Sequence, residues 1–472
     1  MEYDLLVIGA GAAGLSVAAG AAGLGAKVAL IEKEKLGGDC LYYGCVPSKT
    51  LIHTAKVFSL MNRADEFGIN PVHPTHTFAN ITKNVQGVIK SIGRHDDPQR
   101  LRKMGVDVVI GEASFLSPHE VKVKEKVLTA KKIVIATGSR QYVPQLAGLK
   151  ETGFLTHVDI FSLQRMPSSL IILGGGPIGV EMCQAFTRLG CKVTLVEMSD
   201  HILIRDDADA AFRLQGIMEK EGATILCNTK AIKVVRRGKL KEVTIEGGGS
   251  KSAIQAEEIL LAAGRAPNVE GLHLEAAGVR YDQRKIIVDE RLRTSQKHIY
   301  ACGDINGQYL FTHVASYEAG VVIKNALFHL PAKADYTLVP WTTYTDPELA
   351  HIGLTEEVAR QQHSSIKRYT HSFKDIDRAE AEHETEGFIK VICDRKGHIL
   401  GVTILGPHAG ELLHEWALAM SANITIKKIA NMIHAYPTLS LGSKDVAFKY
   451  YKEIASEKTK NIIKRLFGLR GA

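Results

Sequence analysis

The sequence predicts an α/β fold with two doubly wound parallel sheets, because one strand–turn–helix–strand pattern occurs twice along the chain. Each copy runs from a short apolar strand, through a glycine-rich turn and a helix, to a second strand that ends in a glutamate. At 472 residues the chain exceeds what one hydrophobic core usually supports, so several domains are expected.

The first copy occupies the N-terminal end of the chain. Residues 5–8 form an apolar run typical of a buried parallel strand, and an Ala-rich helix is expected to about residue 24, before a strand over 27–31. Three glycines at the G-x-G-x-x-G spacing and one acid mark a dinucleotide-binding turn: Gly9, Gly11, Gly14 and Glu32.

Each residue of this pattern has a physical task. The first glycine allows the tight turn, the second lets the backbone approach a pyrophosphate, and the third lets the helix pack closely. The helix N-terminus offers N–H groups and partial positive charge to phosphates, and the acid accepts hydrogen bonds from ribose hydroxyls.

The second copy follows a strand over 170–173, and its helix is expected to end near residue 189. Its glycines and acid have the same spacing: Gly174, Gly176, Gly179 and Glu197. A single glycine pattern is weak evidence, but two copies with matching strands, helices and acids predict two bound dinucleotides.

A cysteine pair follows the first copy at once. Cys40 and Cys45 lie on a segment that is expected to begin a helix, where N–H dipoles lower the pKa of a thiol. One helical turn brings them within reach of a strained disulfide, and strained disulfides are the reducible, catalytic ones. The alternative is a pair of buried thiols without chemistry.

Composition excludes several other classes of protein. Lys and Arg exceed Asp and Glu by only 8, which argues against a nucleic-acid partner. The N-terminus lacks the basic start of a secretory signal, and no apolar stretch is long enough to cross a membrane. The seven cysteines include no Cys-x-x-Cys, so we expect no metal site and a reducing, cytoplasmic location.

With these features in view, the chain resembles the class I pyridine nucleotide–disulfide oxidoreductases over essentially its whole length. Residues 37–49 resemble the active-site segment of that family. Four further segments resemble family motifs in family order: 133–139, 262–268, 294–304 and 344–348.

The resemblance implies FAD and NAD(H) as cofactors and a homodimer. FAD is expected in a domain of residues 1–149 and 266–338, and NAD(H) in a domain of residues 150–265. Residues 339–472 are expected to form an α+β dimerisation domain.

The resemblance also implies roles for single residues. Cys45 is expected to be the thiolate against the flavin and Cys40 the thiol that exchanges with substrate, with a Lys49–Glu181 ion pair beside the reactive flavin nitrogen. His313 is expected to contribute its backbone rather than an acid or base. The further residues expected at FAD are Gly38, Lys49, Thr137, Gly138, Asp304, Thr312, His313 and Ala315, and Gly264 joins the NAD set.

Glu197 predicts NAD(H) rather than NADP(H). A carboxylate at this place pairs with a free 2′-hydroxyl and repels a 2′-phosphate. Residues 198–201 supply no arginine to bind that phosphate.

The sequence departs from the family at the acid/base site. The family has a His-Pro-Thr motif with a glutamate five residues after the histidine, whereas this chain has Tyr436 and Leu441 at those places. A tyrosine with a pKa near 10 is a poor base at neutral pH. His434 is the alternative base, although a structural histidine is the favoured interpretation.

Three functions are therefore considered. The first is a dihydrolipoamide dehydrogenase-like enzyme acting on a small or protein-bound disulfide or lipoyl group, with a role in cell redox homeostasis. The second is a mercuric-reductase-like reductase of a metal ion or other electrophile, although no cysteine follows Cys393 to form that enzyme's terminal pair. The third is a redox-sensing or partner-binding flavoprotein without fast turnover.

The C-terminal tail, residues 452–472, is rich in Lys and Arg interleaved with apolar residues. A basic amphipathic helix can rest on a membrane surface. The favoured interpretation is a solvated or dimer-packed extension.

Overall fold

The computed structural model describes residues 1–72, 74–328, 330–454 and 457–469, and the chain separates into two compact units. Unit 1 comprises Met1–Gly174, Ala231–Thr244 and Ala253–Asp335. Unit 2 comprises Gly175–Lys230, Ile245–Ser252 and Tyr336–Ala472. The domain boundaries expected from the sequence stay a prediction.

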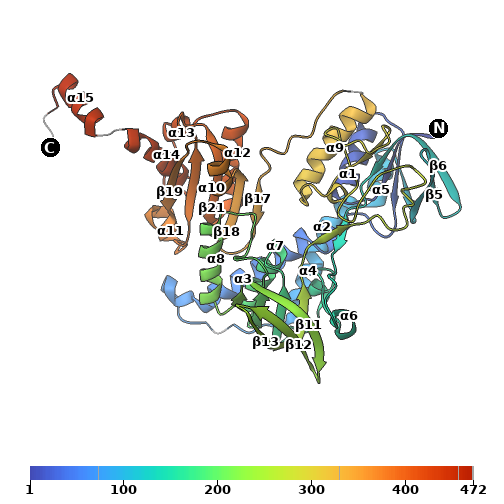
Figure 1. The fold of residues 1–472 in the computed structure, drawn as a ribbon, viewed down its shortest axis with the longest axis horizontal. Coiled ribbons are helices and arrows are strands. Elements are labelled where there is room, and N and C mark those ends of the chain that lie inside the picture. Colours follow the sequence, from blue (N-terminus) through green and yellow to red (C-terminus); the bar gives the residue numbers. More distant parts are fainter. Residues whose placement is uncertain (73, 329, 455–456, 470–472) are drawn as a thin grey trace. The chain divides into compact units, whose positions relative to one another are not determined.

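Unit 1 is built on a seven-stranded sheet with the order β3-β2-β1-β6-β5-β4, in which β16 also pairs with β6 (Figure 1). Its strands are β1 (Tyr3–Ile8), β2 (Val28–Glu32), β3 (Val106–Ile110), β4 (Ala113–Ser117), β5 (Glu120–Val123), β6 (Lys126–Ile135) and β16 (Ile299–Ala301). Strands β3, β2, β1, β6 and β16 pair in parallel, whereas β4 and β5 continue the sheet antiparallel. The predicted parallel α/β sheet is confirmed.

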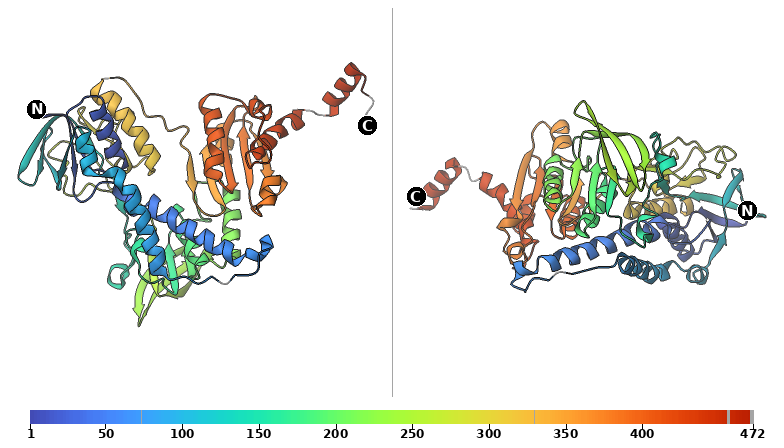
Figure 2. Two further views of the ribbon diagram at one scale, coloured as in Figure 1. Left: turned by 180° about the vertical axis from the view of Figure 1, so that it is seen from behind. Right: turned by 90° about the horizontal axis from the view of Figure 1, so that it is seen from below.

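Helices α1 (Ala12–Gly23) and α9 (Thr312–Leu327) lie side by side in both views of this unit (Figures 1 and 2). The alanines of α1 favour a helix and leave room for close packing. Between these helices and the sheet lies a core of fully buried side chains that includes Leu5, Val7, Leu30, Val134 and Val322. This packing holds the N-termini of both helices near the end of β1.

The cysteine segment forms two helices, α2 (Gly38–Tyr42) and α3 (Cys45–Asn62), and α3 packs against α4 (Phe78–Gly93). The other elements of unit 1 include α5 (Pro98–Lys103), β7 (Ser139–Gln141), α6 (Leu149–Thr152), β8 (Ser169–Leu173), β14 (Glu258–Leu261) and β15 (Arg265–Pro267). Strand β14 pairs in parallel with β8, and β15 pairs antiparallel with β7.

The second copy of the predicted pattern continues from β8 into α7 (Pro177–Arg188) and β9 (Lys192–Val196). In unit 2, α7 packs on β9, which pairs in parallel with β10 (Thr224–Leu226). Helix α8 (Ala208–Lys220) packs against β10. Strands β11 (Thr229–Arg237), β12 (Leu240–Gly247) and β13 (Ser250–Ala256) follow. The order of elements predicted for this copy is confirmed.

The C-terminal part of unit 2 is an antiparallel five-stranded sheet with the order β17-β18-β21-β20-β19. Its strands are β17 (Trp341–Thr343), β18 (Glu348–Gly353), β19 (Lys367–Ser372), β20 (Phe388–Cys393) and β21 (Ile399–Gly406). Helices α12 (Ala409–Ser421) and α14 (Leu441–Ile454) pack on it over a core centred on Trp416. The predicted α+β domain is confirmed.

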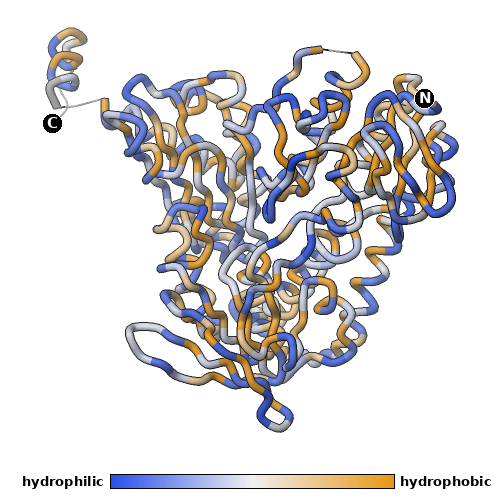
Figure 3. The backbone as a smooth tube through the Cα atoms, turned by 45° about the vertical axis from the view of Figure 1, so that its right-hand side comes forward, coloured by the Kyte–Doolittle hydropathy of each residue, from blue (hydrophilic) through white to orange (hydrophobic). Residues whose placement is uncertain are grey.

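Helix α15 (Glu457–Phe467) bears out the helical tendency of the tail. Hydrophilic and hydrophobic residues interleave along it (Figure 3), and Leu466 and Phe467 are exposed. Arg470, the last basic residue of the predicted tail, lies outside the described residues. Within the described ranges, no helix combines the length and apolar composition that a membrane span requires.

Candidate active site

The first glycine turn is shaped by backbone that approaches too closely for a side chain. Gly9 has a φ of 100°, and a Cβ on it would collide with the carbonyl oxygen of Ala136. A Cβ on Gly14 would collide with the carbonyl oxygen of Gly9, so only glycine lets α1 begin this close to β1. A Cβ on Gly11 would have room, because the nearest atom, the Cα of Gly38, would lie 3.9 Å from it.

Glu32 closes the turn from the end of β2. Its Oε2 accepts the N–H of Ala10 at 2.8 Å, and its Oε1 accepts the N–H of Glu34 at 2.9 Å. An ionised carboxylate has about four lone-pair sites, so each oxygen keeps capacity for a ribose hydroxyl.

The second turn repeats this geometry. Gly174 has a φ of 116°, and a Cβ on it would collide with the carbonyl oxygen of Ala262. Glu197 Oε2 accepts the N–H of Gly175 at 2.6 Å, and the place of a Cβ on Gly176 has no atom within 4 Å. Gly179 is buried within α7, and Gly264 has a φ of 102°.

In both turns the first glycine packs against a backbone carbonyl group, while the second glycine leaves space next to a helix N-terminus. A pyrophosphate group requires such a space beside a helix N-terminus. A methyl group on Gly11 or Gly176 would occupy the space left for the phosphates. The residues present therefore fit FAD at the first turn and a nicotinamide dinucleotide at the second. The roles of the single residues stay predictions.

The two cysteines lie on different helices, which corrects the expectation of one helix start. Cys40 belongs to α2, whereas Cys45 is the first residue of the 18-residue α3. Gly44 separates them in a tight turn, where a Cβ would lie 3.1 Å from the Cα of Cys40. Both cysteines are thiols here, with Cys45 exposed and Cys40 partly buried.

The Cys45 sulfur faces the starts of two helices. Its Sγ lies 3.7 Å from the Oγ1 of Thr312, and Thr312 is the first residue of α9. Ala315, one turn further along, is buried. Helix N-termini carry N–H groups without intrahelical partners, and their partial positive charge stabilises a thiolate. The arrangement favours negative charge on Cys45.

The expectation of a lowered thiol pKa is wrong for Cys40. Its hydrogen bond with Cys45 raises the pKa of Cys40 most, followed by burial and by negative charge on Cys45, whereas Thr312 opposes the shift. Two neighbouring thiols carry one negative charge between them more easily than two, because two thiolates repel each other. Negative charge on Cys45 therefore opposes deprotonation of Cys40.

The segments expected around the flavin are joined by hydrogen bonds within unit 1. Thr137 Oγ1 donates to the carbonyl oxygen of Asn268 at 2.8 Å, and Asn268 Nδ2 donates to the carbonyl oxygen of Thr137 at 2.9 Å. Gly138 has a φ of 70°. Ser139 Oγ donates to Asp304 Oδ2 at 2.5 Å. Hydrogen bonds thus connect residues 137–139 with Asn268 and with the carboxylate of Asp304.

Helix α9 is connected to the same segments. His313 is exposed, and its ring stacks on Phe311 with 5.3 Å between centroids. Glu318 is fully buried, and its Oε2 accepts the N–H of Gly303 at 2.6 Å. This bond fixes the turn that carries Asp304.

Lys49 and Glu181 belong to different units, so their ion pair stays a prediction. Lys49 lies one turn after Cys45 on α3, and its Nζ donates to Ser48 Oγ at 3.2 Å. Glu181 is buried on α7, and its Oε1 accepts the N–H of Tyr344 at 2.9 Å.

The two acid/base candidates differ in exposure. Tyr436 is 70% exposed, and its hydroxyl donates to Asp377 Oδ2 at 2.9 Å. The His434 side chain is only 3% exposed; its Nε2 lies 3.0 Å from Glu415 Oε1 and its Nδ1 lies 3.3 Å from the carbonyl oxygen of Met432. Both ring nitrogens of His434 are therefore engaged within the chain, as expected of a structural histidine.

Residues 3–319 match the family model of the pyridine nucleotide-disulphide oxidoreductases, and residues 339–445 match the model of that family's dimerisation domain. The chain belongs to the pyridine nucleotide–disulphide oxidoreductase family. The family predicted from the sequence motifs is confirmed, and the dimerisation domain supports the predicted homodimer.

Relatives with two different activities are about equally similar. A mercuric reductase from Staphylococcus aureus is 32% identical over 96% of this chain and 83% of its own length. A dihydrolipoyl dehydrogenase from Bacillus subtilis is 33% identical over 93% of this chain and 96% of its own length. The HOCl-induced flavoprotein disulfide reductase RclA from Escherichia coli, solved as a Cu(II) complex, has a TM-score of 0.84 and 29% identity over 94% and 99% of the two chains.

Members of this family use FAD and a pyridine nucleotide, as the two glycine turns predicted. The chain is a flavin-dependent disulfide oxidoreductase. The named relatives divide between mercury and lipoyl chemistry, so the likeness alone favours neither substrate.

Three residues near the cysteines were not among the predicted site residues: Asp39, His157 and Arg265. Asp39 precedes Cys40, and its carboxylate contacts His157 and Arg265. An acid next to a reactive cysteine was a visible signal for Asp39, whereas nothing in the sequence marked His157 as its partner.

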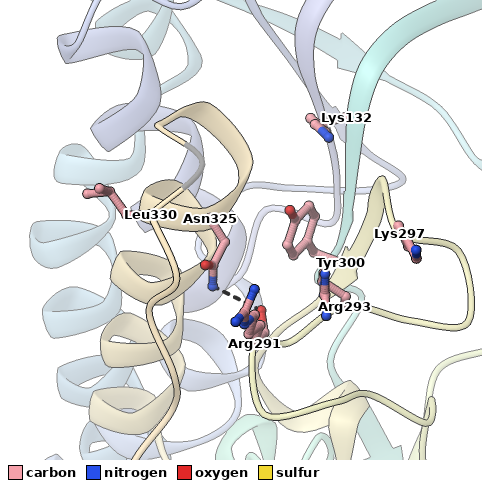
Figure 4. A pocket seen from close by; sticks show the side chains of 7 residues that line it. All are labelled: Lys132, Arg291, Arg293, Lys297, Tyr300, Asn325 and Leu330. Carbon is pink, nitrogen blue, oxygen red and sulfur yellow. Dashed lines mark hydrogen bonds between the residues drawn. The ribbon is translucent and has the colours of Figure 1, made fainter.

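A pocket of about 250 Å³ lies elsewhere in unit 1 (Figure 4). It is lined by Lys132, Arg291, Arg293, Lys297, Tyr300, Asn325 and Leu330. Asn325 Nδ2 donates to the carbonyl oxygen of Arg291 at 3.2 Å, which ties α9 to the loop that bears the arginines. The pocket shares no residue with the predicted flavin set, and it has four cationic side chains, of which Arg293 is paired with Asp289 at 2.7 Å.

Proposed function

We propose that the Cys40–Cys45 pair passes electrons from NADH to an external disulfide, with Cys45 as the thiolate that faces the flavin and Cys40 as the exchanging thiol. The observation that carries this assignment is the position of Cys45, at the first residue of α3 and 3.7 Å from the hydroxyl at the start of α9. Bound FAD supplies the two-electron link between the nicotinamide and the sulfur pair.

Cys40 gives up its proton and attacks one sulfur of the substrate disulfide, which breaks the substrate S–S bond, forms a mixed disulfide and releases a first thiolate. The Cys45 thiolate then attacks the Cys40 sulfur and releases the second substrate thiolate. The first released thiolate takes up the proton that Cys40 lost, and the second takes up a proton from the solvent. NADH then gives up a hydride equivalent, two electrons and one proton, which breaks the Cys40–Cys45 disulfide, restores the Cys40 thiol and the Cys45 thiolate and leaves NAD⁺.

Glu197 supports NAD(H) as the nucleotide. Its Oε2 accepts the N–H of Gly175 at 2.6 Å and its Oε1 that of Ser199 at 2.8 Å, which holds the carboxylate at the end of β9, where a ribose would lie. A fixed negative charge there repels a 2′-phosphate. The isolated cysteines other than the reactive pair support a reducing, cytoplasmic location.

The substrate class follows from the missing acid/base pair. Tyr436 is exposed and suits a position facing a substrate, but the hydrogen bond to Asp377 and the charge of Asp377 raise the pKa of Tyr436 above its ordinary value. A neutral phenol can donate a proton to a leaving thiolate, but it is a poor base toward a dithiol. The site therefore favours reduction of a disulfide or lipoyl group over fast oxidation of dihydrolipoamide.

A second candidate function is reduction of a soft metal ion held by the two sulfurs. A mercuric reductase is among the relatives of the chain, and a site with a tyrosine in place of the histidine lacks the base that dihydrolipoamide oxidation needs. In this case the ion is the substrate, and Cys40 and Cys45 are its thiolate ligands.

Anaerobic titration with NADH tests the proposal. Addition of one equivalent is expected to give a long-wavelength thiolate-to-flavin absorption band, because Cys45 then lies as a thiolate beside oxidised flavin. Cys45→Ala should abolish this band, and Cys40→Ser should keep it without disulfide turnover. Persistence of the band in Cys45→Ala would contradict the assignment.

Steady-state assays then separate the functions. NADH oxidation measured with lipoamide, oxidised glutathione, Hg²⁺ and Cu²⁺ identifies the acceptor class. Turnover with lipoamide or glutathione but not with ions supports the first function, and the reverse supports the second. A normal band without turnover on any acceptor would indicate a redox-sensing flavoprotein.

A further inference from the structure

The side chain next to Cys40 is anchored by two segments that are distant in sequence. Asp39 Oδ1 lies 2.9 Å from Nε2 of His157, and Asp39 Oδ2 accepts a hydrogen bond from Arg265 at 2.8 Å. His157 precedes β8 and Arg265 begins β15, and both belong to the same compact unit as the cysteines.

Arg265 extends this anchor to Asp304, one of the residues predicted to bind FAD. Its Nε donates to Ser139 Oγ at 2.7 Å, and Ser139 Oγ donates to Asp304 Oδ2 at 2.5 Å. The Nε of Arg265 also lies 3.7 Å from Asp304 Oδ2. One guanidinium thus stands between the carboxylate beside Cys40 and the carboxylate of Asp304.

The two partners of Asp39 are shielded from water, whereas the Asp39 side chain itself is 36% exposed. The side chains of His157 and Arg265 are 4% and 11% exposed. His157 Nδ1 is buried without a hydrogen-bond partner among the described residues, whereas His157 Nε2 lies 2.9 Å from Asp39 Oδ1 and 3.3 Å from Arg265 Nη1.

The charge on Asp39 is stable in this setting. Burial alone would raise the pKa of Asp39, but the hydrogen bond from His157 and the charge of Arg265 outweigh burial and lower it. The carboxylate is therefore ionised at neutral pH. Hydrogen bonds between charged groups are about twice as strong as neutral ones, and shielding strengthens them further.

We propose that Asp39 is a positioning residue, which fixes the Cys40–Cys45 pair relative to Asp304 through Arg265. This inference rests on the proposed roles of the cysteines and of Asp304. Because α2 contains only five residues, its own backbone bonds hold it weakly, and the Asp39 side chain supplies the missing constraint. The anchor then controls the distance between the sulfurs and the flavin ring, and with it the charge-transfer absorption and the dithiol–disulfide potential.

Asp39→Asn in the full-length holoprotein tests this role. The amide keeps the size and one acceptor of Asp39 but removes the charge that Arg265 binds. We expect the long-wavelength band of the NADH-reduced protein to fall at least twofold and kcat for disulfide reduction to fall about tenfold. The KM for NADH should stay within twofold, because the hydrogen bonds of Asp39 go to His157 and Arg265 and not to a glycine of the second turn.

Asp4→Asn is the matched control. Asp4 lies in the same unit and is also ion-paired, with Lys131 Nζ 2.8 Å from its Oδ1, but its hydrogen bonds and ion pair among the described residues do not reach the cysteine segment. Its band, potential and kcat should equal those of the unmodified protein. Arg265→Gln combined with Asp39→Asn should lower the band no further than Asp39→Asn alone, since both changes break one anchor.

The outcomes separate this inference from the proposed function. Loss of the band in the unmodified protein would defeat the proposed function itself. A normal band there, together with an unchanged band and potential in Asp39→Asn, would overturn the positioning role. If Asp39→Asn does not fold, Asp39→Glu replaces it; this variant keeps the charge on a longer arm, so an unchanged band would likewise overturn the inference.

Discussion

The hydroxyl of Thr312 lies 3.7 Å from the Cys45 sulfur, and Thr312 begins α9. Thr312→Val keeps the shape of the side chain and removes the hydroxyl donor. A hydrogen bond to a charged group is worth about 1.5 kcal/mol, which corresponds to about one pKa unit. Loss of an interaction with the anion raises the pKa of a thiol.

We therefore expect the pH midpoint of the long-wavelength band of NADH-reduced Thr312→Val to rise by about one unit. Thr54→Val is the control, because its Oγ1 donates to the carbonyl oxygen of Thr50 on α3, away from the sulfur. Equal midpoints in both variants would show that the hydroxyl does not act on Cys45.

Asp206 is a buried carboxylate in unit 2, and its Oδ1 accepts the indole N–H of Trp341 at 2.8 Å. Burial raises the pKa of Asp206 to about 7, and the charge of Asp207 adds to the shift. Between about pH 4 and pH 7 the unfolded chain has lost a proton that the folded chain still holds. The free energy of unfolding therefore falls as pH rises through this interval, by on the order of 4 kcal/mol.

Asp206→Asn removes this fall in the free energy of unfolding, because the amide accepts the Trp341 hydrogen bond and cannot ionise. We expect its urea midpoint to exceed that of the unmodified protein at pH 8, and the gain to shrink as pH falls toward 4. A difference that does not vary with pH would exclude ionisation of Asp206 as its cause.

In the glycine turn after β1, one glycine of the G-x-G-x-x-G pattern is needed for folding and another for ligand binding. Gly9 is required by the fold, because its φ of 100° and the carbonyl oxygen of Ala136 leave no room for a Cβ. Gly11 is required only by a ligand, because its Cβ would meet no protein atom closer than 3.9 Å.

Gly9→Ala should therefore lower the thermal midpoint of the flavin-free protein by several degrees. Gly11→Ala should leave that midpoint nearly unchanged and yet retain little flavin after purification, as judged by visible absorbance. Equal flavin content in Gly11→Ala and the unmodified protein would contradict pyrophosphate binding at this turn.

Elements specified by local patterns could be predicted from the sequence. Strands β1 and β2, helix α1 and their counterparts β8, α7 and β9 agree with expectation, because apolar runs and glycine spacing act over a few residues. The break between α2 and α3 was not foreseen. It depends on Gly44, whose backbone passes against Cys40, and an approach of this kind leaves no periodic pattern.

The anchor of Asp39 could not be predicted for a different reason. His157 and Arg265 reach Asp39 only after β7, β8 and β15 are in place, and a single sequence does not reveal such contacts. The departure at Tyr436 was visible as a changed residue, but its bond to Asp377 was not.

We expect that an acid/base pair can be supplied to the dimer by changes at two positions. Tyr436→His with Leu441→Glu supplies a base with a pKa near 6.5 and, at the first residue of α14, a carboxylate to orient it. A carboxylate at a helix N-terminus is also favourable. Dihydrolipoamide oxidation by NAD⁺ should rise about 100-fold, since a positioned base contributes roughly 10²–10⁴ in rate.

Tyr436→Phe is the control for this gain. It removes the phenol without supplying a base, so dihydrolipoamide oxidation should stay at the level of the unmodified protein. No gain in the double variant, at any pH between 6 and 9, would place the acid/base site elsewhere.

Hybrid dimers decide which subunit supplies that base. In one hybrid, a subunit with Cys45→Ala, Tyr436→His and Leu441→Glu pairs with an unmodified subunit, so the intact cysteines and the new histidine lie on different chains. In the other, a Cys45→Ala subunit pairs with a Tyr436→His, Leu441→Glu subunit, so both lie on one chain. Two affinity tags isolate each hybrid.

The dimerisation-domain match over residues 339–445 and the exposure of Tyr436 favour a base that acts on the partner's cysteines. The first hybrid should then show the raised rate of dihydrolipoamide oxidation, at about half the value of the double-variant homodimer, because one of its two sites is intact. The second hybrid should stay at the unmodified rate, because its intact cysteines meet a tyrosine. A raised rate in the second hybrid alone would mean that each chain completes its own site.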